Sequence, residues 1–255
     1  MILEMSPPPY VYKTVLAPSV TLPPYYNTGD VFFYDGFEDW VRRGGRNDNS
    51  PNNTGSTIIT SEVAHTGQNS LMLKCPSSGF QDYNLTFNIA NTGSDVTQPL
   101  IVGMEAHVMI RSGTSSLLGF SIERTGFNND ETTKREWRCE VVNNDVVREV
   151  TGTNGSINTT LGNMHFQRTD QGTTGQSLER SIWYPMKLTA DLNNVGAGAF
   201  SFRVGQRVFI ATQADRATYS TGTIPADLVR FEFHCSVSTA TYYIDDMFLT
   251  KELSI

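Results

Sequence analysis

The clearest pair of candidate catalytic groups is Glu136 and Glu140, which flank Arg138 in the string Glu-Trp-Arg-Cys-Glu. Alternate residues of an extended strand lie on one face, so both carboxylates and the guanidinium share one side of a sheet. A retaining glycosidase needs two carboxyl groups about 5–5.5 Å apart, one of them protonated. Because Arg138 favours the ionised form of both acids, the string predicts a charge-paired strand and no catalytic residue.

Glu105, His107, Glu123 and His234 are expected to line the same face as this string. A cluster of His, Glu and Arg would suit a polysaccharide lyase, although nothing in the spacing requires one. Other reaction classes lack their sequence motifs: the chain has no G-x-S-x-G turn, no phosphate-binding glycine loop and no HExxH pair. These absences leave carbohydrate binding without chemistry as a candidate function.

Sugars stack on exposed aromatic rings and hydrogen-bond to planar polar side chains. The candidate glycan-binding residues are Trp40, Glu105, His107, Arg138, Tyr184 and His234. Trp137, Trp183 and Tyr242 are eligible as well. For every one of these aromatic residues, packing in the core is the alternative.

The three cysteines, Cys75, Cys139 and Cys235, lie far apart and form no CxxC pair. Cys139 and Cys235 fall on the apolar parity of their predicted strands. A free thiol in such a position behaves as a small hydrophobic group, so we expect three buried, unpaired cysteines.

Composition excludes several classes of protein. The 255-residue chain is 38% hydrophobic and 18% charged, with a net charge of −7. A net negative chain is unsuited to tracking nucleic-acid phosphates, and no apolar run approaches the ~20 residues that a membrane-spanning helix requires. We therefore expect neither nucleic-acid binding nor membrane insertion.

The elements that must position these residues are short strands. Apolar and polar residues alternate, as where Met104, Ala106 and Val108 interleave with Glu105 and His107. This period of two predicts strands with one face on the core and one face in water. Thirteen strands are expected, at 31–34, 57–63, 70–74, 83–89, 101–110, 117–124, 136–142, 145–150, 183–191, 199–204, 207–212, 228–236 and 241–250. The polar stretches 42–56 and 151–180 are expected to be loops.

Residues 1–28 differ from the rest and form a predicted N-terminal arm, followed by a β-sandwich domain over 29–255. Six prolines in the arm exclude helix and favour extended backbone. Apolar residues between the prolines indicate a strap that lies across a partner or across its own domain rather than a solvated tail. The expected contact residues are Tyr10, Tyr12, Leu16, Leu22, Tyr25 and Tyr26.

Four stretches of sequence resemble a known family. They are the opening Phe32–Trp40 (FFYDGFEDW), then Ala64–Leu73 (AHTGQNSLML), Trp183–Thr189 (WYPMKLT) and the closing Tyr243–Thr250 (YIDDMFLT). In order and spacing they are similar to concanavalin A-like lectin/glucanase domains and to jelly-roll carbohydrate-binding modules. The resemblance spans 31–250 and implies an all-β fold, a two-sheet antiparallel jelly-roll sandwich.

The first and last strands of a jelly roll lie side by side, which would bring Asp35, Glu38 and Asp39 towards Asp245 and Asp246. Crowded carboxylates repel one another unless a positive charge lies among them. In the carbohydrate-binding modules these positions resemble a structural calcium site, with Glu38 and Asp246 as the matching residues. The alternative is that the acids bond backbone amides or pair with Arg42 and Arg43.

Three functions are consistent with these observations. The first is a non-enzymatic structural protein of a viral particle, such as a phage capsid decoration, fibre or tail-associated protein. Its arm would bind a major capsid protein, a tail protein or a second copy of the chain. Met1–Met5 has no basic residue and prolines follow at once, so we expect no export signal and a location on the virion surface.

The second function is a lectin or glycan-binding module, which could bind cell-surface glycans and act outside the cell. The third is a glycoside hydrolase or polysaccharide lyase of the lectin-like fold. We predict the first function, a structural protein of a viral particle, with the other two as alternatives.

Overall fold

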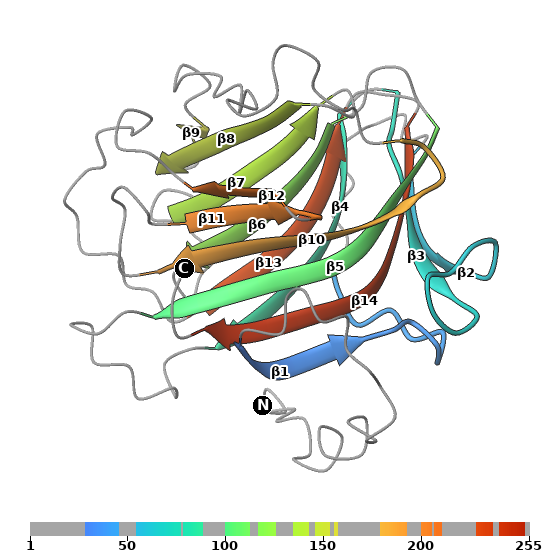
Figure 1. Ribbon diagram of the computed structural model, residues 1–255, viewed down its shortest axis with the longest axis horizontal. Helices are drawn as coiled ribbons and strands as arrows, with labels where there is room; N and C mark the ends of the chain where they lie inside the picture. The colour runs from blue at the N-terminus through green and yellow to red at the C-terminus, as the bar shows by residue number, and fades with distance from the viewer. Residues whose placement is uncertain are drawn as a thin grey trace, which may run out of the picture.

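A computed structural model gives the fold of the chain. It describes residues 29–45, 55–77, 79–88, 100–112, 117–125, 135–142, 146–153, 156–157, 179–192, 200–205, 207–210, 228–236 and 240–252. These residues form two antiparallel sheets stacked as the two layers of a sandwich (Figure 1). Within the described ranges, no helix has the length and apolar character needed to cross a membrane.

The larger sheet has eight strands in the order β12-β11-β10-β5-β14-β3-β2, with β1 paired to β14. Their bounds are β1 Gly29–Asp35, β2 Ser56–Thr60, β3 Ser70–Lys74, β5 Ile101–Ser112, β10 Trp183–Asp191, β11 Phe200–Val204, β12 Arg207–Ile210 and β14 Thr241–Glu252. The smaller sheet has six strands in the order β4-β13-β6-β7-β8-β9. Their bounds are β4 Phe80–Asn88, β6 Leu117–Thr125, β7 Arg135–Val142, β8 Val146–Thr153, β9 Ser156–Ile157 and β13 Leu228–Ser236.

All thirteen predicted strands have a counterpart in these sheets, so the predicted two-sheet sandwich is confirmed. The prediction of an uninterrupted loop over 151–180 is wrong at its start. There β8 continues to Thr153 and Ser156–Ile157 pairs back on it as β9. Threonine, serine and isoleucine at these positions are compatible with strand backbone, and the ladder of β8 extends the sheet by one short strand.

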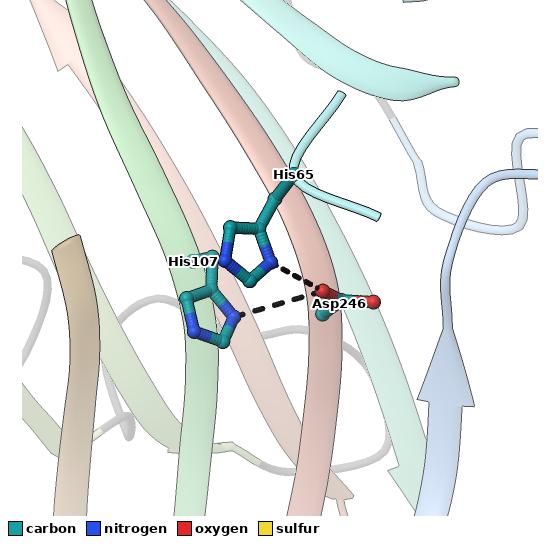
Figure 2. Close-up of side chains that lie close together, drawn as sticks. All are labelled: His65, His107 and Asp246. Carbon is teal, nitrogen blue, oxygen red and sulfur yellow. Dashed lines mark hydrogen bonds and ion pairs between the residues drawn. The ribbon is translucent and has the colours of Figure 1, made fainter. Parts of the chain in front are cut away.

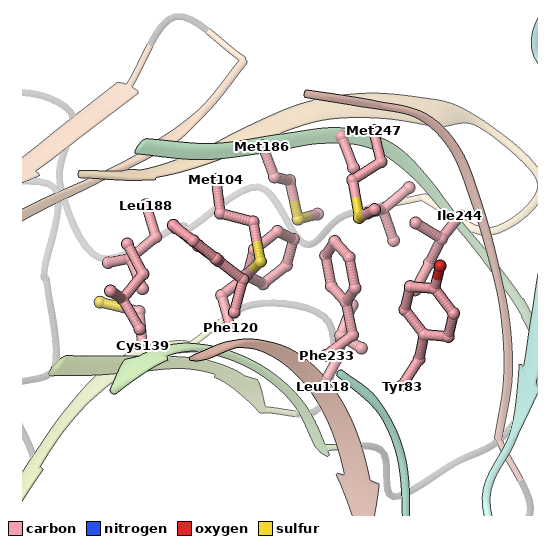
Figure 3. Packing of buried hydrophobic residues seen from close by; sticks show 14 of the residues in the cluster. Tyr83, Met104, Leu118, Phe120, Cys139, Met186, Leu188, Phe233, Ile244 and Met247 are labelled. Atoms are coloured by element: carbon pink, nitrogen blue, oxygen red, sulfur yellow. The ribbon is translucent and has the colours of Figure 1, made fainter. Parts of the chain in front are cut away.

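The core lies between the sheets and is built from the apolar parity of each strand. Met104, Met186 and Leu188 descend from the larger sheet, while Phe120 and Phe233 rise from the smaller one (Figure 3). The Phe120 ring lies 4.9 Å from the Phe233 ring and 5.2 Å from the Phe202 ring, both edge to face. Edge-to-face aromatic packing adds to the free energy of burial, so Phe120 joins the two layers.

Cys75, Cys139 and Cys235 are free and buried, as expected.

The first and last described strands pair directly, which confirms the jelly-roll prediction for the ends of the domain. Tyr34 lies opposite Phe248, and Asp35 lies opposite Met247. On its other side β14 pairs with β5, and this ladder is irregular between Asp245 and Phe248. Asp246, inside the irregularity, has φ of +48°, a backbone conformation unfavourable for a residue with a side chain.

Residues 1–28, including the predicted arm contacts Tyr10, Tyr12, Leu16, Leu22, Tyr25 and Tyr26, lie outside the described residues. The division into an arm over 1–28 and a sandwich domain over 29–255 stays a prediction.

Replacing Phe120 with alanine should lower the free energy of unfolding by about 3–5 kcal/mol, because it opens a cavity between the sheets and removes two ring pairs. Denaturant unfolding of both proteins would measure the difference. Val208→Ala, at a side chain that is 47% exposed, is the control and should change stability by less than about 0.5 kcal/mol. A loss below about 1 kcal/mol for Phe120→Ala would contradict the assigned packing.

Candidate functional site

The outer face of the six-stranded sheet carries three rows of polar residues that run across its strands. Arg230 lies opposite Glu123 in the first row. The second row is Asn84, Glu232, Ser121 and Arg138. The third row is Asp82, His234, Gly119 and Glu140. We call these residues the polar face.

Two ion pairs and one contact of a histidine with a carboxylate hold the side chains of the polar face together. Arg138 Nη1 lies 3.7 Å from Glu140 Oε1, and His234 Nε2 lies 3.8 Å from the same oxygen. Arg230 Nη1 lies 3.5 Å from Glu123 Oε2. These contacts hold the guanidinium and carboxylate groups in a fixed pattern over the sheet.

Gly119 lets the ring of His234 lie flat. A Cβ atom at position 119 would come within 2.1 Å of His234 Cε1, so any larger residue would push the imidazole away from the sheet. The ring is 6% exposed, and among the described residues none hydrogen-bonds to its Nδ1. Burial, and then the charge of Arg138, hold the pKa of His234 well below its usual value. The imidazole is therefore neutral near pH 7.

The polar face is far less solvated than the alternating sequence predicts. Glu123, Arg138, Glu140 and Glu232 are only 2–8% exposed, so the expectation of one face in water is wrong here. Charged side chains are stable at such low exposure when they pair with one another. The same pairing fixes their positions before any ligand binds.

A second polar group lies on the outer face of the eight-stranded sheet. Lys187 Nζ is 2.5 Å from Glu252 Oε1 and 3.7 Å from Glu105 Oε2. Burial raises the pKa of Glu105 to about 7, with Lys187 opposing and Glu252 adding to the shift. Gly103 makes room for the group, because a Cβ there would lie 2.5 Å from Thr250 Oγ1.

The predicted glycan-binding residues separate onto these two faces. Arg138 and His234 belong to the polar face, whereas Glu105 and His107 lie on β5 in the other sheet. The prediction that Glu105, His107, Glu123 and His234 line one face is wrong. The strand β5 belongs to the eight-stranded sheet and β6 to the six-stranded sheet. Side chains that point away from the core on these two consecutive strands therefore lie on opposite sides of the sandwich.

The aromatic candidates also separate. Trp40 is 59% exposed beyond the end of β1, while Tyr184 packs partly against the core and its hydroxyl accepts a hydrogen bond from the Glu179 amide at 2.8 Å. Trp137 and Tyr242 are buried at 2% and 1% exposure, as their alternative interpretation expected. The edge of Trp183 meets the ring of His65.

The acids of the calcium hypothesis have different partners. Glu38 accepts hydrogen bonds from the backbone amides of Gln68 and Asn69, each at 3.0 Å. Asp246 accepts them from the hydroxyls of Tyr34 at 3.0 Å and Thr66 at 2.7 Å. A calcium ion held by Glu38 and Asp246 stays a prediction.

The other acids follow the alternative interpretation. Asp35 accepts bonds from the Phe37 amide at 2.9 Å and from Arg43 at 3.0 Å, and Asp39 also pairs with Arg43. Arg42 does not join them; it donates to the Thr57 carbonyl at 3.2 Å instead.

Sequence reasoning missed Arg230 and Glu232 as members of the polar face. The signal was present, since both share the outward parity of His234 on β13. It also missed His65, whose spatial neighbours lie far away in the chain and whose loop has no periodicity.

No family model and no curated protein matches this chain. Among solved structures, "Cellulose induced protein, Cip1" is similar with a TM-score of 0.51 at 12% identity, covering 88% of this chain and 99% of that one. A protein of unknown function with a galectin-like fold from Bacillus subtilis has a TM-score of 0.51 at 11% identity, covering 88% of this chain and 97% of that one.

A xylan-binding CBM22-1 domain from Paenibacillus barcinonensis Xyn10C has a TM-score of 0.43 at 12% identity, covering 89% of this chain and 98% of the domain. The first two similarities confirm the concanavalin A-like jelly-roll fold, and at these identities they show the fold alone. Assignment to a viral particle finds no support in them.

Glu105→Gln should become more stable relative to the wild-type protein as the pH rises from 5 to 8. The folded-state pKa of Glu105 exceeds its unfolded value, so wild-type stability falls as the pH rises towards 7, where the group is ionised in the unfolded chain and still protonated in the folded one, and levels off above that pH. The difference between the two proteins should change by up to about 3 kcal/mol over this range. Melting temperatures across the pH range would measure it.

The control is Glu62→Gln, the same replacement at an exposed position. A pH dependence for Glu105→Gln no larger than that of the control would contradict the raised pKa of Glu105.

Proposed function

We propose that this protein is a glycan-binding module that binds a neutral, hydroxyl-rich polysaccharide on the polar face of its six-stranded sheet. The observation that carries the proposal is the set of three fixed rows of charged and polar side chains on one sheet face. The jelly-roll fold is compatible with this role.

The chemistry of the polar face suits sugar hydroxyls. Carboxylates accept hydrogen bonds and guanidinium groups donate them in pairs, while a hydroxyl can do both. The neutral imidazole of His234 adds a donor and an acceptor, and its buried Nδ1, to which no described residue hydrogen-bonds, favours a ligand contact. Side chains on a sheet repeat every ~7 Å along a strand and ~5 Å across strands, which presents such groups as a two-dimensional array.

The charge balance favours a neutral glycan. The polar face holds four carboxylates, Asp82, Glu123, Glu140 and Glu232, against the guanidinium groups of Arg138 and Arg230. With a chain net charge of −7, this excess of negative charge would repel uronic acids or sulfated sugars. We therefore infer that the ligand is an uncharged polymer of hexose or pentose sugars.

We infer binding without cleavage. Glu140 is ion-paired with Arg138, whose Nη1 lies 3.7 Å from its Oε1, whereas a retaining glycosidase pairs two carboxyl groups. The hydrolase and lyase hypotheses predict shortened or unsaturated products, which chromatography after incubation with a glycan panel would detect.

A role on a viral particle, with residues 1–28 as the anchoring arm, stays a prediction, as do partner subunits and a virion-surface or extracellular location. It depends on the arm, which the described residues do not include.

Arg138→Ala and His234→Ala should each weaken polysaccharide binding by about 10–100-fold, because each removes hydrogen bonds from a charged or buried group. A glycan array would first identify the ligand, and titration calorimetry would then compare the variants. Arg111→Ala is the matched control, since it makes the same change at an exposed position on the other sheet and should leave the affinity unchanged.

The variant Trp40→Ala distinguishes binding on the polar face from binding at the exposed ring of Trp40. A loss of affinity with Trp40→Ala and none with Arg138→Ala or His234→Ala would contradict binding on the polar face. An array without any neutral glycan signal would contradict the proposed function.

A further inference from the structure

Two histidines and an aspartate meet on the eight-stranded sheet, on the side of the sandwich opposite the polar face (Figure 2). His65 comes from the segment between β2 and β3, His107 from β5, and Asp246 from the irregular part of β14. His65 Nδ1 lies 2.8 Å from Asp246 Oδ2, and His107 Nδ1 lies 3.7 Å from the same oxygen. All three candidate ligand atoms lie within 4.8 Å of one another.

The surrounding residues hold Asp246 in place. Tyr34 and Thr66 donate hydrogen bonds to Oδ1, which leaves Oδ2 directed at the two histidines.

Asp245 positions the loop that carries His65. Its carboxylate Oδ2 accepts hydrogen bonds from the backbone amides of His65 at 2.8 Å and Thr66 at 3.1 Å. Its Oδ1 accepts one from the Asp246 amide at 2.8 Å. One fully buried carboxylate thus ties the histidine loop to the bend that presents Asp246.

A simple hydrogen bond accounts for His65 but leaves His107 unexplained. The His107 residue is 4% exposed, and none of the described residues hydrogen-bonds to its Nδ1. The 3.7 Å separation from Asp246 is too long for a hydrogen bond. A buried imidazole nitrogen that no described residue hydrogen-bonds can donate a lone pair to a metal ion.

We propose that His65, His107 and Asp246 form a binding site for a divalent transition-metal ion of the zinc class. Tetrahedral zinc with bonds of about 2.0–2.1 Å places neighbouring ligand atoms about 3.3 Å apart, and the observed separations of 2.8 and 3.7 Å lie on either side of this value. Two imidazole nitrogens favour zinc, copper, nickel or cobalt over calcium, which takes oxygen ligands.

Binding needs only a small rearrangement. The two imidazole rings stack 3.8 Å apart with 11° between their planes, so both Nδ1 atoms face Asp246 side by side. Rotation about χ2, a soft torsion in histidine, would turn both lone pairs onto one ion. The ring proton of His65 would then lie on Nε2 instead of Nδ1, so that Nδ1 presents its lone pair to the ion.

The partial exposure of the His65 side chain, 28%, gives an ion a route to the site. With three protein ligands, a fourth position stays available to water or to a ligand oxygen. The ion would join the β2–β3 segment to β5 and β14, so its binding should stabilise the fold.

The test uses the full chain, stripped with chelator and titrated with zinc. Zinc should bind with one ion per chain and raise the melting temperature. Cobalt should give the visible absorption of a nitrogen-containing, low-coordinate site. His107→Ala removes a metal ligand. It should weaken zinc binding by more than the loss of about 10–100-fold that follows when a residue that only hydrogen-bonds to a metal ligand is removed.

A second variant, His65→Ala, is included because His107→Ala could fail to fold, whereas His65 is partly exposed in a loop. His65→Ala should fold, and it should lose both zinc affinity and the zinc-induced rise in melting temperature. Glu62→Gln, a nearby exposed acid outside the cluster, should keep both. The proposal is overturned if millimolar zinc, cobalt, copper and nickel all fail to bind, or if both histidine variants bind zinc as the wild-type protein does. Glycan binding on the polar face is measured separately, and its failure would leave this result untouched.

Discussion

The pairing of β1 with β14 is the constraint on which the rest of this structure depends. It joins two segments more than two hundred residues apart and completes the eight-stranded sheet. On the other side of β14, the irregular pairing with β5 bends the backbone at Asp245 and Asp246. At that bend the carboxylate of Asp246 lies on the outer face of the sheet, beside His65 and His107. The carboxylate of Asp245 lies against the loop that carries His65 and accepts hydrogen bonds from its backbone amides. Without the bend, the outer face of β14 would present regular alternating side chains and no convergent group.

Both outer faces of the sandwich bury charge, which is unusual for antiparallel strands that have one side on the core. Removing charged groups from water is costly, and pairing offsets much of that cost. Lys187 serves two carboxylates on one face, while Arg138 and His234 share Glu140 on the other. Such pairing contributes little net stability, but it fixes side-chain positions. Fixed positions suit recognition, because less conformational entropy is lost when a ligand binds.

The sequence predicted the strands and their core parity, since period-two alternation and turn residues are local signals. The pairing of the first and last strands was predicted from the resemblance to jelly-roll domains. The sequence failed where assignment depended on the sheet that a strand joins. Glu105 and Glu123 have equivalent parity on consecutive strands, yet they lie on opposite sides of the molecule. It also failed at His65, because contact with His107 and Asp246 arises only from the topology. The positive φ of Asp246 had no local signal, because glycine is the residue that usually marks such a position.

Gly119 has a consequence for how this protein could diversify. Gly119 lies directly beneath the imidazole of His234, where a Cβ atom would clash with that ring. Adding a single methyl group there would tilt the ring upright and alter the depth of the surface, while leaving every charged group of the polar face in the sequence. A substitution at position 119 would therefore change the shape of the polar face, and with it the choice among ligands. The charged side chains of the polar face would stay the same.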